Sequence, residues 1–264
     1  MLDDVRSTNP VLKNLTNEEH TAGYSYAPEI QQDRPLTVDD IVSKTGITIA
    51  VIILFAAINF GIYLSGNAGV GMILTLVGGI GAFVVTLVHA FSRTFGSRTV
   101  TLLYAAFEGL FLGGFSLLIS GWFSVGGADA GQMIFQAILG TLGVFIGMLV
   151  VYRTGAIRVT PRLNRLITGA IFGVVIMALG NLLLALFTGQ NPLRDGGTMS
   201  IIFGVVCVVL AAISFLQDFD LADRLVRTSA PSNAAWGVAL GLAVTLVWLY
   251  TEILRLLSYF ANDR

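Results

Sequence analysis

Long apolar stretches dominate the chain after a polar beginning. Seven segments of about 20 mainly apolar residues alternate with short polar connections, and a helix needs about this length to cross a bilayer. The predicted spans are Ile47–Ser65, Val70–Phe91, Thr99–Ser120, Met133–Tyr152, Leu166–Phe187, Met199–Phe219 and Ala235–Phe260. No stretch shows the apolar and polar alternation of an outer-membrane barrel. We therefore predict an all-α, polytopic integral membrane protein with seven transmembrane helices in one bundle.

Composition supports this class and separates two regions. The chain is 55% hydrophobic and only 12% charged. This composition is typical of an integral membrane protein rather than of a soluble domain of this length. Residues 1–45 differ, with eight acids and four bases, and predict a mostly disordered cytoplasmic tail before a transmembrane domain at 46–264. Thr37, followed by Asp39 and Asp40, suits a helix start. A short interfacial helix and a flexible leader are both compatible with this signal.

The basic residues predict how the chain is oriented. Twelve of them lie on one side of the predicted membrane, in the tail and in the connections after spans two, four and six: Arg6, Lys13, Arg34, Lys44, Arg93, Arg98, Arg153, Arg158, Arg162, Arg165, Arg224 and Arg227. The opposite side holds only Arg194 and Arg264. Because Lys and Arg concentrate on the cytoplasmic side, the amino terminus is predicted in the cytoplasm and the carboxyl terminus outside.

Three acidic residues lie within the apolar stretches. Carboxylates at such depth are costly and are functional candidates by default. At about 1.5 Å of rise per residue, Glu108 falls near the midplane and Asp218 at the cytoplasmic end of span six, with Asp220 just beyond it. Glu252 falls past the midplane, toward the outer face. Arg255 follows Glu252 by three residues on the same helix face, so the two can form an ion pair.

Each acid also has a structural interpretation. Asp218 could be an ordinary interfacial acid, and Glu252 with Arg255 could be an ion pair that fixes helix packing. Glu108 has no basic residue one turn away in the sequence. A partner on another helix or water must therefore stabilise it, or it is protonated, which makes Glu108 the best single candidate for a titrating group.

Other kinds of chemistry have no support in the chain. Cys207 is the only cysteine, so a disulfide or a cysteine metal cluster within one chain is excluded. There is no glycine-rich phosphate loop, zinc-binding histidine pair or nucleophile elbow, and the bases form no compact basic domain. We predict no enzymatic activity, no cofactor and no nucleic-acid partner.

Pairs of glycines four residues apart predict close helix packing. Such pairs let helix backbones approach in lipid, and they occur in spans three, four and seven: Gly109 with Gly113, Gly143 with Gly147, and Gly237 with Gly241. These three spans are therefore predicted to be interior helices.

Several short motifs, taken in order, resemble one membrane family. They are Phe107-Glu108-Gly109-Leu110 in span three, Leu216-Gln217-Asp218-Phe219-Asp220 closing span six, and Leu249-Tyr250-Thr251-Glu252-Ile253-Leu254-Arg255-Leu256-Leu257 in span seven. Together they resemble the Bax inhibitor family. The tail segment Ser7-Thr8-Asn9-Pro10-Val11-Leu12 is similar to that of its bacterial members with a long polar amino tail. The resemblance covers nearly the whole chain and implies a central helix surrounded by the others, a bacterial plasma-membrane location and a pH-sensitive calcium leak.

The resemblance also implies a pair of aspartates, one from each of the last two spans, that share a proton and gate the path. Asp218 matches the first position. For the second, the Leu-Tyr-x-acid pattern gives Glu252, whereas counting back from the Leu-Arg ending gives Thr245. If Thr245 is the counterpart, the shared-proton latch is absent, and Asp220 could act as the partner of Asp218.

These observations lead to one principal hypothesis and one alternative. The first is passive conduction of Ca²⁺ or another cation through the bundle, gated by protonation, with oxygen sites at Asp218 and Glu108, because carboxylates suit that ion. The alternative is a non-conducting regulator in the bilayer that binds another membrane protein, such as a protease or respiratory complex. The sequence does not identify such a protein partner.

Overall fold

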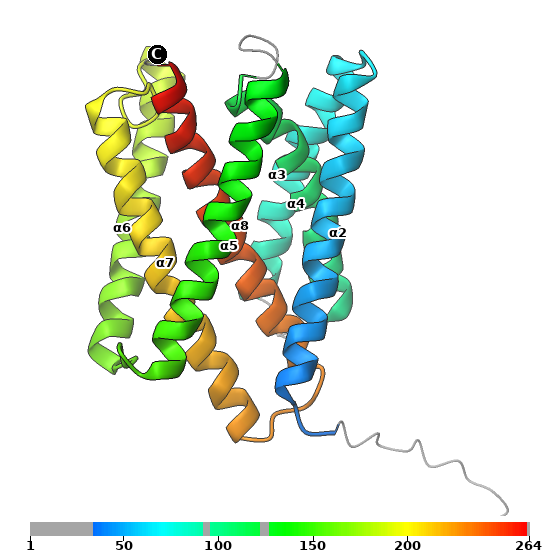
Figure 1. Ribbon diagram of the computed structural model, residues 1–264, viewed down its shortest axis with the longest axis vertical. Coiled ribbons are helices and arrows are strands. Elements are labelled where there is room, and N and C mark those ends of the chain that lie inside the picture. Colours follow the sequence, from blue (N-terminus) through cyan, green and yellow to red (C-terminus); the bar gives the residue numbers. More distant parts are fainter. Residues whose placement is uncertain (1–33, 92–95, 122–126, 263–264) are drawn as a thin grey trace, which may run out of the picture. The chain divides into compact units, whose positions relative to one another are not determined.

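The chain forms seven α-helices and no β-strand over the residues that this computed structural model describes, 34–91, 96–121 and 127–262 (Figure 1). They are α2 (Val38–Leu64), α3 (Ala68–Phe91), α4 (Arg98–Ile119), α5 (Gly127–Thr154), α6 (Pro161–Thr188), α7 (Thr198–Arg227) and α8 (Ala234–Asn262). Each is long and apolar enough to cross a membrane. The predicted all-α, seven-span architecture is confirmed.

The first helix begins before the expected domain boundary at residue 46. Thr37 caps α2: its hydroxyl accepts from the Asp40 N–H, and the Asp40 carboxylate accepts from the Thr37 N–H. This reciprocal capping satisfies amides that would otherwise lack partners, so the polar turn and the first span form one continuous helix. Residues 1–33 of the tail predicted at residues 1–45 lie outside the described residues.

The sixth span is longer than its apolar part. It was expected to end at Phe219, but α7 continues to Arg227. Two ion pairs at i,i+4 spacing, Asp220 with Arg224 and Asp223 with Arg227, support these polar turns. Asp218 therefore lies about 13 Å of helix before the end of α7.

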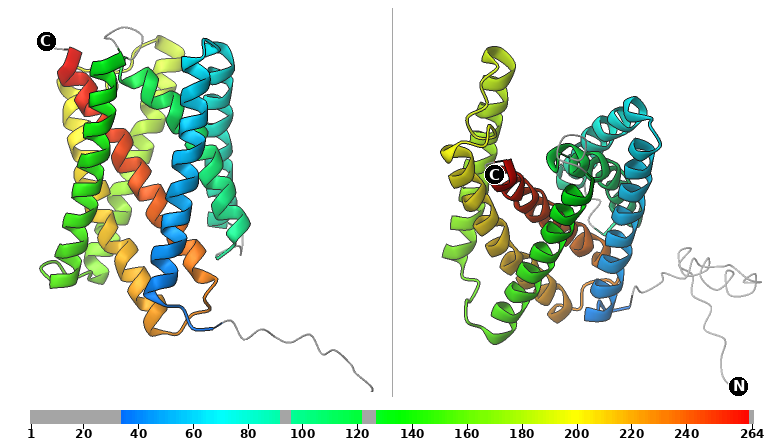
Figure 2. Two further views of the ribbon diagram at one scale, coloured as in Figure 1. Left: turned by 45° about the vertical axis from the view of Figure 1, so that its right-hand side comes forward. Right: turned by 45° about the horizontal axis from the view of Figure 1, so that its top comes forward.

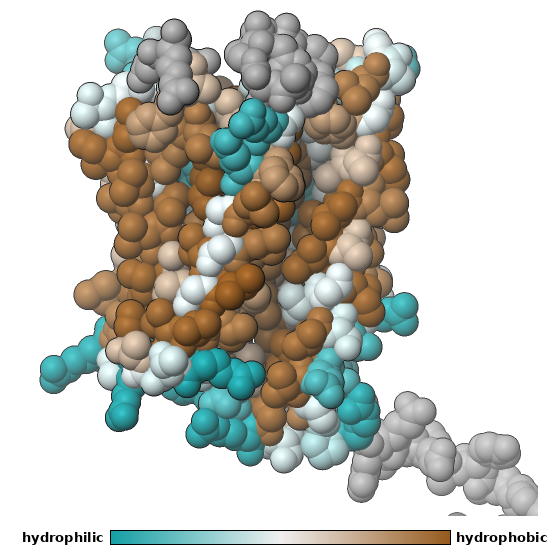
Figure 3. All heavy atoms as spheres, viewed as in Figure 1, coloured by the Kyte–Doolittle hydropathy of each residue, from teal (hydrophilic) through white to brown (hydrophobic). Residues whose placement is uncertain are grey.

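Helix α8 occupies the middle of the bundle. It runs obliquely between the other helices (Figures 1 and 2) and packs against α2, α4, α5 and α7. Half or more of the apolar windows of α4, α7 and α8 is buried, whereas none of the α6 window is. Accordingly, α6 lies at the periphery beside α7 (Figure 2). Figure 3 shows an apolar surface over the middle of the bundle, with polar residues gathered at the end where α7 finishes.

The glycine pairs have different roles in packing. A β-carbon at Gly109 or Gly113 of α4 would collide with backbone carbonyl oxygens of α2, so these glycines permit close approach. Gly143 and Gly147 of α5 face open space. The interior position predicted for α4 and α8 is correct, but α5 is mostly exposed and α7 is the third interior helix.

Candidate functional site

Asp218 of α7 meets Thr245 of α8 inside the bundle. The Thr245 hydroxyl donates a 2.7 Å hydrogen bond to Oδ2 of Asp218. Gly241, one turn before Thr245, lies beside the carboxylate, and a β-carbon there would make an ordinary contact with Oδ1 at 3.9 Å. Asp218 is partly exposed and Thr245 is buried. Among the described residues, no basic side chain forms an ion pair with Asp218, so the charge of an ionised Asp218 is not compensated by a salt bridge.

Asp220 does not serve as the partner of Asp218. Its carboxylate lies 2.7 Å from Nε of Arg224, one turn further along the helix. Side chains two residues apart on a helix point in different directions, which explains why Asp218 and Asp220 are not brought together. Of the three partners considered from the sequence, Thr245 is the residue that contacts Asp218.

Glu252 lies in a separate ionic cluster nearer the other end of α8. Arg194 donates to both of its carboxylate oxygens, at 2.9 and 3.0 Å, and Arg255 approaches to 3.2 Å. Only 4% of the Glu252 side chain is exposed. Sequence reasoning paired Glu252 with Arg255 but missed Arg194. The available signal was that Arg194 is an isolated base on the predicted outer side, the side toward which Glu252 was placed.

The connection between α6 and α7 positions Arg194. Asp195 accepts hydrogen bonds from the Gly197 N–H at 2.9 Å and the Ser200 hydroxyl at 2.7 Å, and these donors hold the pKa of Asp195 below its ordinary value. On the α6 side, the Leu193 N–H donates to the side chain of Asn181. Both ends of the connection are therefore tied to neighbouring helices.

Glu108 lies apart from the other two acids. It is buried in α4, and its hydrogen-bonding neighbour is Tyr104, one turn earlier. No hydrogen bond or ion pair among the described residues links Glu108, Asp218 and Glu252 to one another, and no group of three or more potential metal-binding side chains comes together there. The acids remain at separate levels, as their spacing in the sequence predicts.

Thr245 and Glu252 nevertheless share one face of α8. They are seven residues, or about two helical turns, apart, and both bond to residues from α7 or the connection before it. Two small buried residues of α7 precede Asp218: Ser214 by about one turn and Ala211 by about two turns. The α7–α8 interface therefore contains two carboxylates. Asp218 lies beside Thr245, and Glu252 lies about 10 Å further along α8.

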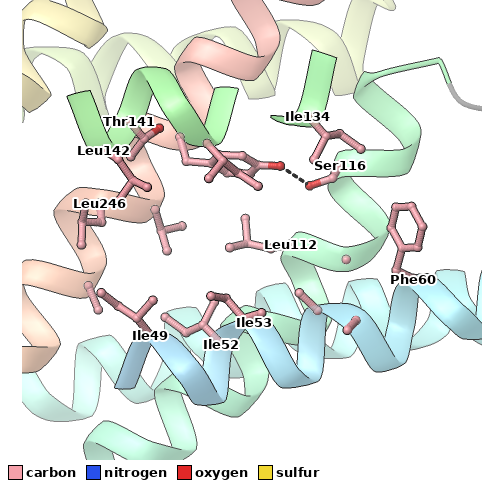
Figure 4. Close-up of a pocket in the computed structure, with 17 residues that line it drawn as sticks. Ile49, Ile52, Ile53, Phe60, Leu112, Ser116, Ile134, Thr141, Leu142 and Leu246 are labelled. Carbon is pink, nitrogen blue, oxygen red and sulfur yellow. Dashed lines mark hydrogen bonds between the residues drawn. The ribbon is translucent and has the colours of Figure 1, made fainter. Parts of the chain in front are cut away.

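An apolar cavity of about 430 Å³ lies on another face of α8, between α2, α4 and α5. In Figure 4, Ile49, Ile52 and Ile53 of α2 point into it, with Thr141 and Leu142 of α5 on the opposite side. Ser116 and Tyr250 join their hydroxyls at its edge, 2.7 Å apart. Because its wall is almost wholly apolar, this cavity offers a cation far weaker ligands than the α7–α8 interface does.

Comparison with known proteins identifies a similar family. The model of a family described as Bax inhibitor 1 like matches residues 9–262. The matched region contains all seven described helices and all three acids. A search among curated proteins found no match.

Proposed function

Because this chain belongs to the Bax inhibitor 1 like family, we propose that it is a pH-sensitive cation leak in which Asp218 is the titrating gate residue and Ca²⁺ is the permeant ion. The observation that carries the proposal is the environment of Asp218: a partly exposed carboxylate inside a membrane bundle, bonded to a neutral hydroxyl and to no basic side chain among the described residues.

The chemistry of Asp218 suits both conduction and gating. An ionised carboxylate is an oxygen ligand for a hard cation, and acids along a pore favour cations. Protonation removes that charge and changes the hydrogen bonding between α7 and α8. Thr245, one of the two positions that the resemblance offers for a second aspartate, contacts Asp218. We propose that Asp218 therefore has no carboxylate with which to share its proton. We propose that a single carboxylate, rather than a pair, senses pH in this chain.

The two carboxylate levels of the α7–α8 interface have different roles in this proposal. Asp218 accepts the proton or the ion. Glu252 is already neutralised by Arg194 and Arg255, so we assign it to holding α8 against the α6–α7 connection. Glu108, buried and without a basic partner among the described residues, is the second candidate for a titrating group and ion site.

The charge pattern supports a location and an orientation. The bases that follow spans two, four and six, including Arg153 and Arg224, lie at the end of the bundle where α5 and α7 finish. By the positive-inside rule, we propose that this end faces the cytoplasm. The resemblance to bacterial members of the family supports our proposal that the membrane is a bacterial plasma membrane. Asp218 would then respond to cytoplasmic pH.

Calcium flux into liposomes containing the purified protein tests this function. We expect flux above that of empty liposomes, and a reduced flux in the double variant Glu108→Gln, Asp218→Asn. If the protein conducts but the double variant keeps both its flux and its pH dependence, the assignment of the acids is wrong. If the protein moves no ions at any pH, the leak itself is contradicted, and a non-conducting regulator of another membrane protein becomes the better account.

A further inference from the structure

A second hollow, of about 750 Å³, opens between α2, α5 and α7 at the end of the bundle where α2 begins and α7 finishes. Its inner wall is apolar and includes Ile49 of α2, Phe145 of α5 and Leu242 of α8. Its outer edge carries two bases, Arg153 and Arg227, and one acid, Asp223. The groove thus passes from a hydrocarbon-like surface to a cationic rim, and this gradient suits an amphipathic molecule with a negative head.

Thr45 supplies an unsatisfied donor inside this groove. Its side chain lines the wall and only 8% of the residue is exposed, yet its hydroxyl has no hydrogen-bond partner among the described residues. Buried hydroxyls in proteins are nearly always bonded. Ester carbonyl and phosphate oxygens of a phospholipid are acceptors that can enter an otherwise apolar groove at this depth.

The two arginines at the rim differ in their availability. Arg227 is 2.8 Å from Asp223 and is largely neutralised by it. Arg153, at the end of α5, is exposed and forms no ion pair with any described residue. Because a guanidinium group binds phosphate through two parallel hydrogen bonds, Arg153 is the residue that would select a negatively charged headgroup.

We propose that this groove binds one anionic phospholipid, with an acyl chain along the apolar wall, the ester region at Thr45 and the phosphate at Arg153. Figure 3 shows an apolar belt over the middle of the bundle and polar residues at the end where α7 finishes. A groove with an apolar wall and a charged rim at that end matches how a lipid is placed in a bilayer. The inference needs only the membrane bundle and does not depend on ion conduction.

Lipid retention in native mass spectrometry tests the site. The full chain in neutral detergent is titrated with dioleoylphosphatidylglycerol or dioleoylphosphatidylcholine. We expect one retained molecule and a preference of about fivefold for the anionic lipid, the effect of one basic residue at a membrane surface. Arg153→Gln abolishes this preference, while Arg153→Lys keeps part of it. Thr45→Val weakens retention of both lipids, because the ester region is common to them.

Arg158→Gln is the matched control. Arg158 is exposed at the same end of the bundle and carries the same charge, but it does not line the groove. This variant must keep the lipid preference. Equal retention of the two lipids by the unaltered protein, or an equal loss of preference in the Arg153→Gln and Arg158→Gln variants, would overturn the proposal.

Discussion

The hydroxyl of Thr245 on α8 donates a 2.7 Å hydrogen bond to the carboxylate of Asp218 on α7. This contact joins two interior helices through one ionisable group and one neutral group. Under the proposed function, the pH dependence of the leak should therefore follow the titration of the Asp218 carboxylate.

Replacing Thr245 by Asp would place a second carboxylate within reach of the first. Two carboxylates this close cannot both ionise cheaply and lose their protons in two coupled steps. We expect the single-step pH dependence of calcium flux to become a broader, two-step curve in Thr245→Asp. Thr251→Asp is the control, since the Thr251 hydroxyl donates to the Trp248 carbonyl of its own helix. An unchanged single step in Thr245→Asp would contradict the assignment of this contact to the gate.

The Glu252 cluster predicts an order of stability losses. Removing the charge of Glu252 leaves two guanidinium groups close together, so Glu252→Gln should cost about 3 kcal/mol. Arg194→Gln should cost less, because Arg255 still neutralises Glu252. Asp220→Asn breaks a more exposed ion pair and should cost at most about 1 kcal/mol. Thermal unfolding in detergent measures all three, and the reverse order would rule out a structural role for Glu252.

Close packing of α4 on α2 predicts that its glycines tolerate no added methyl group. Gly113→Ala forces a β-carbon against the carbonyl of Ala56 and should destabilise the bundle by about 1–3 kcal/mol. Gly143→Ala faces open space and should leave stability unchanged or slightly raised, because alanine favours helix. The same thermal measurement compares the two variants. Equal effects would show that the α2–α4 approach is not tight.

The connection that carries Arg194 should loosen only in acid. The Gly197 N–H and the Ser200 hydroxyl lower the pKa of Asp195 in the folded protein. Its contribution is therefore complete above the ordinary aspartate pKa and is lost as the pH falls through the lowered pKa. Hydrogen exchange across residues 191–200, corrected for the intrinsic rate, should reveal this step and its absence in Asp195→Asn. Loss of protection at neutral pH in the unaltered protein would contradict it.

The sequence predicts the fold well because the bilayer imposes simple rules on helices. Length and hydropathy alone locate all seven helices. They do not predict where a helix ends in a polar region, and so the final turns of α7, supported by two ion pairs, were missed. The spacing of glycines does not predict which of them pack against another helix. Gly109 contacts a neighbouring backbone, whereas Gly143 faces open space.

The candidate site was only partly predictable. The cost of a carboxylate in an apolar stretch identifies Asp218, Glu108 and Glu252 without any structure. Their partners depend on helix rotation and on connections distant in the sequence, as the Arg194–Glu252 contact shows. The choice between Glu252 and Thr245 as the residue opposite Asp218 required the register between α7 and α8.

Calcium flux into proteoliposomes at stepped pH tests the central claim most directly. The unaltered protein is compared with Asp218→Asn and with Asp223→Asn, which removes an acid of the same helix that is paired with Arg227. We predict a flux that changes with pH in the unaltered protein and in Asp223→Asn, and that loses this dependence in Asp218→Asn. A pH-dependent flux that survives unchanged in Asp218→Asn would contradict the account.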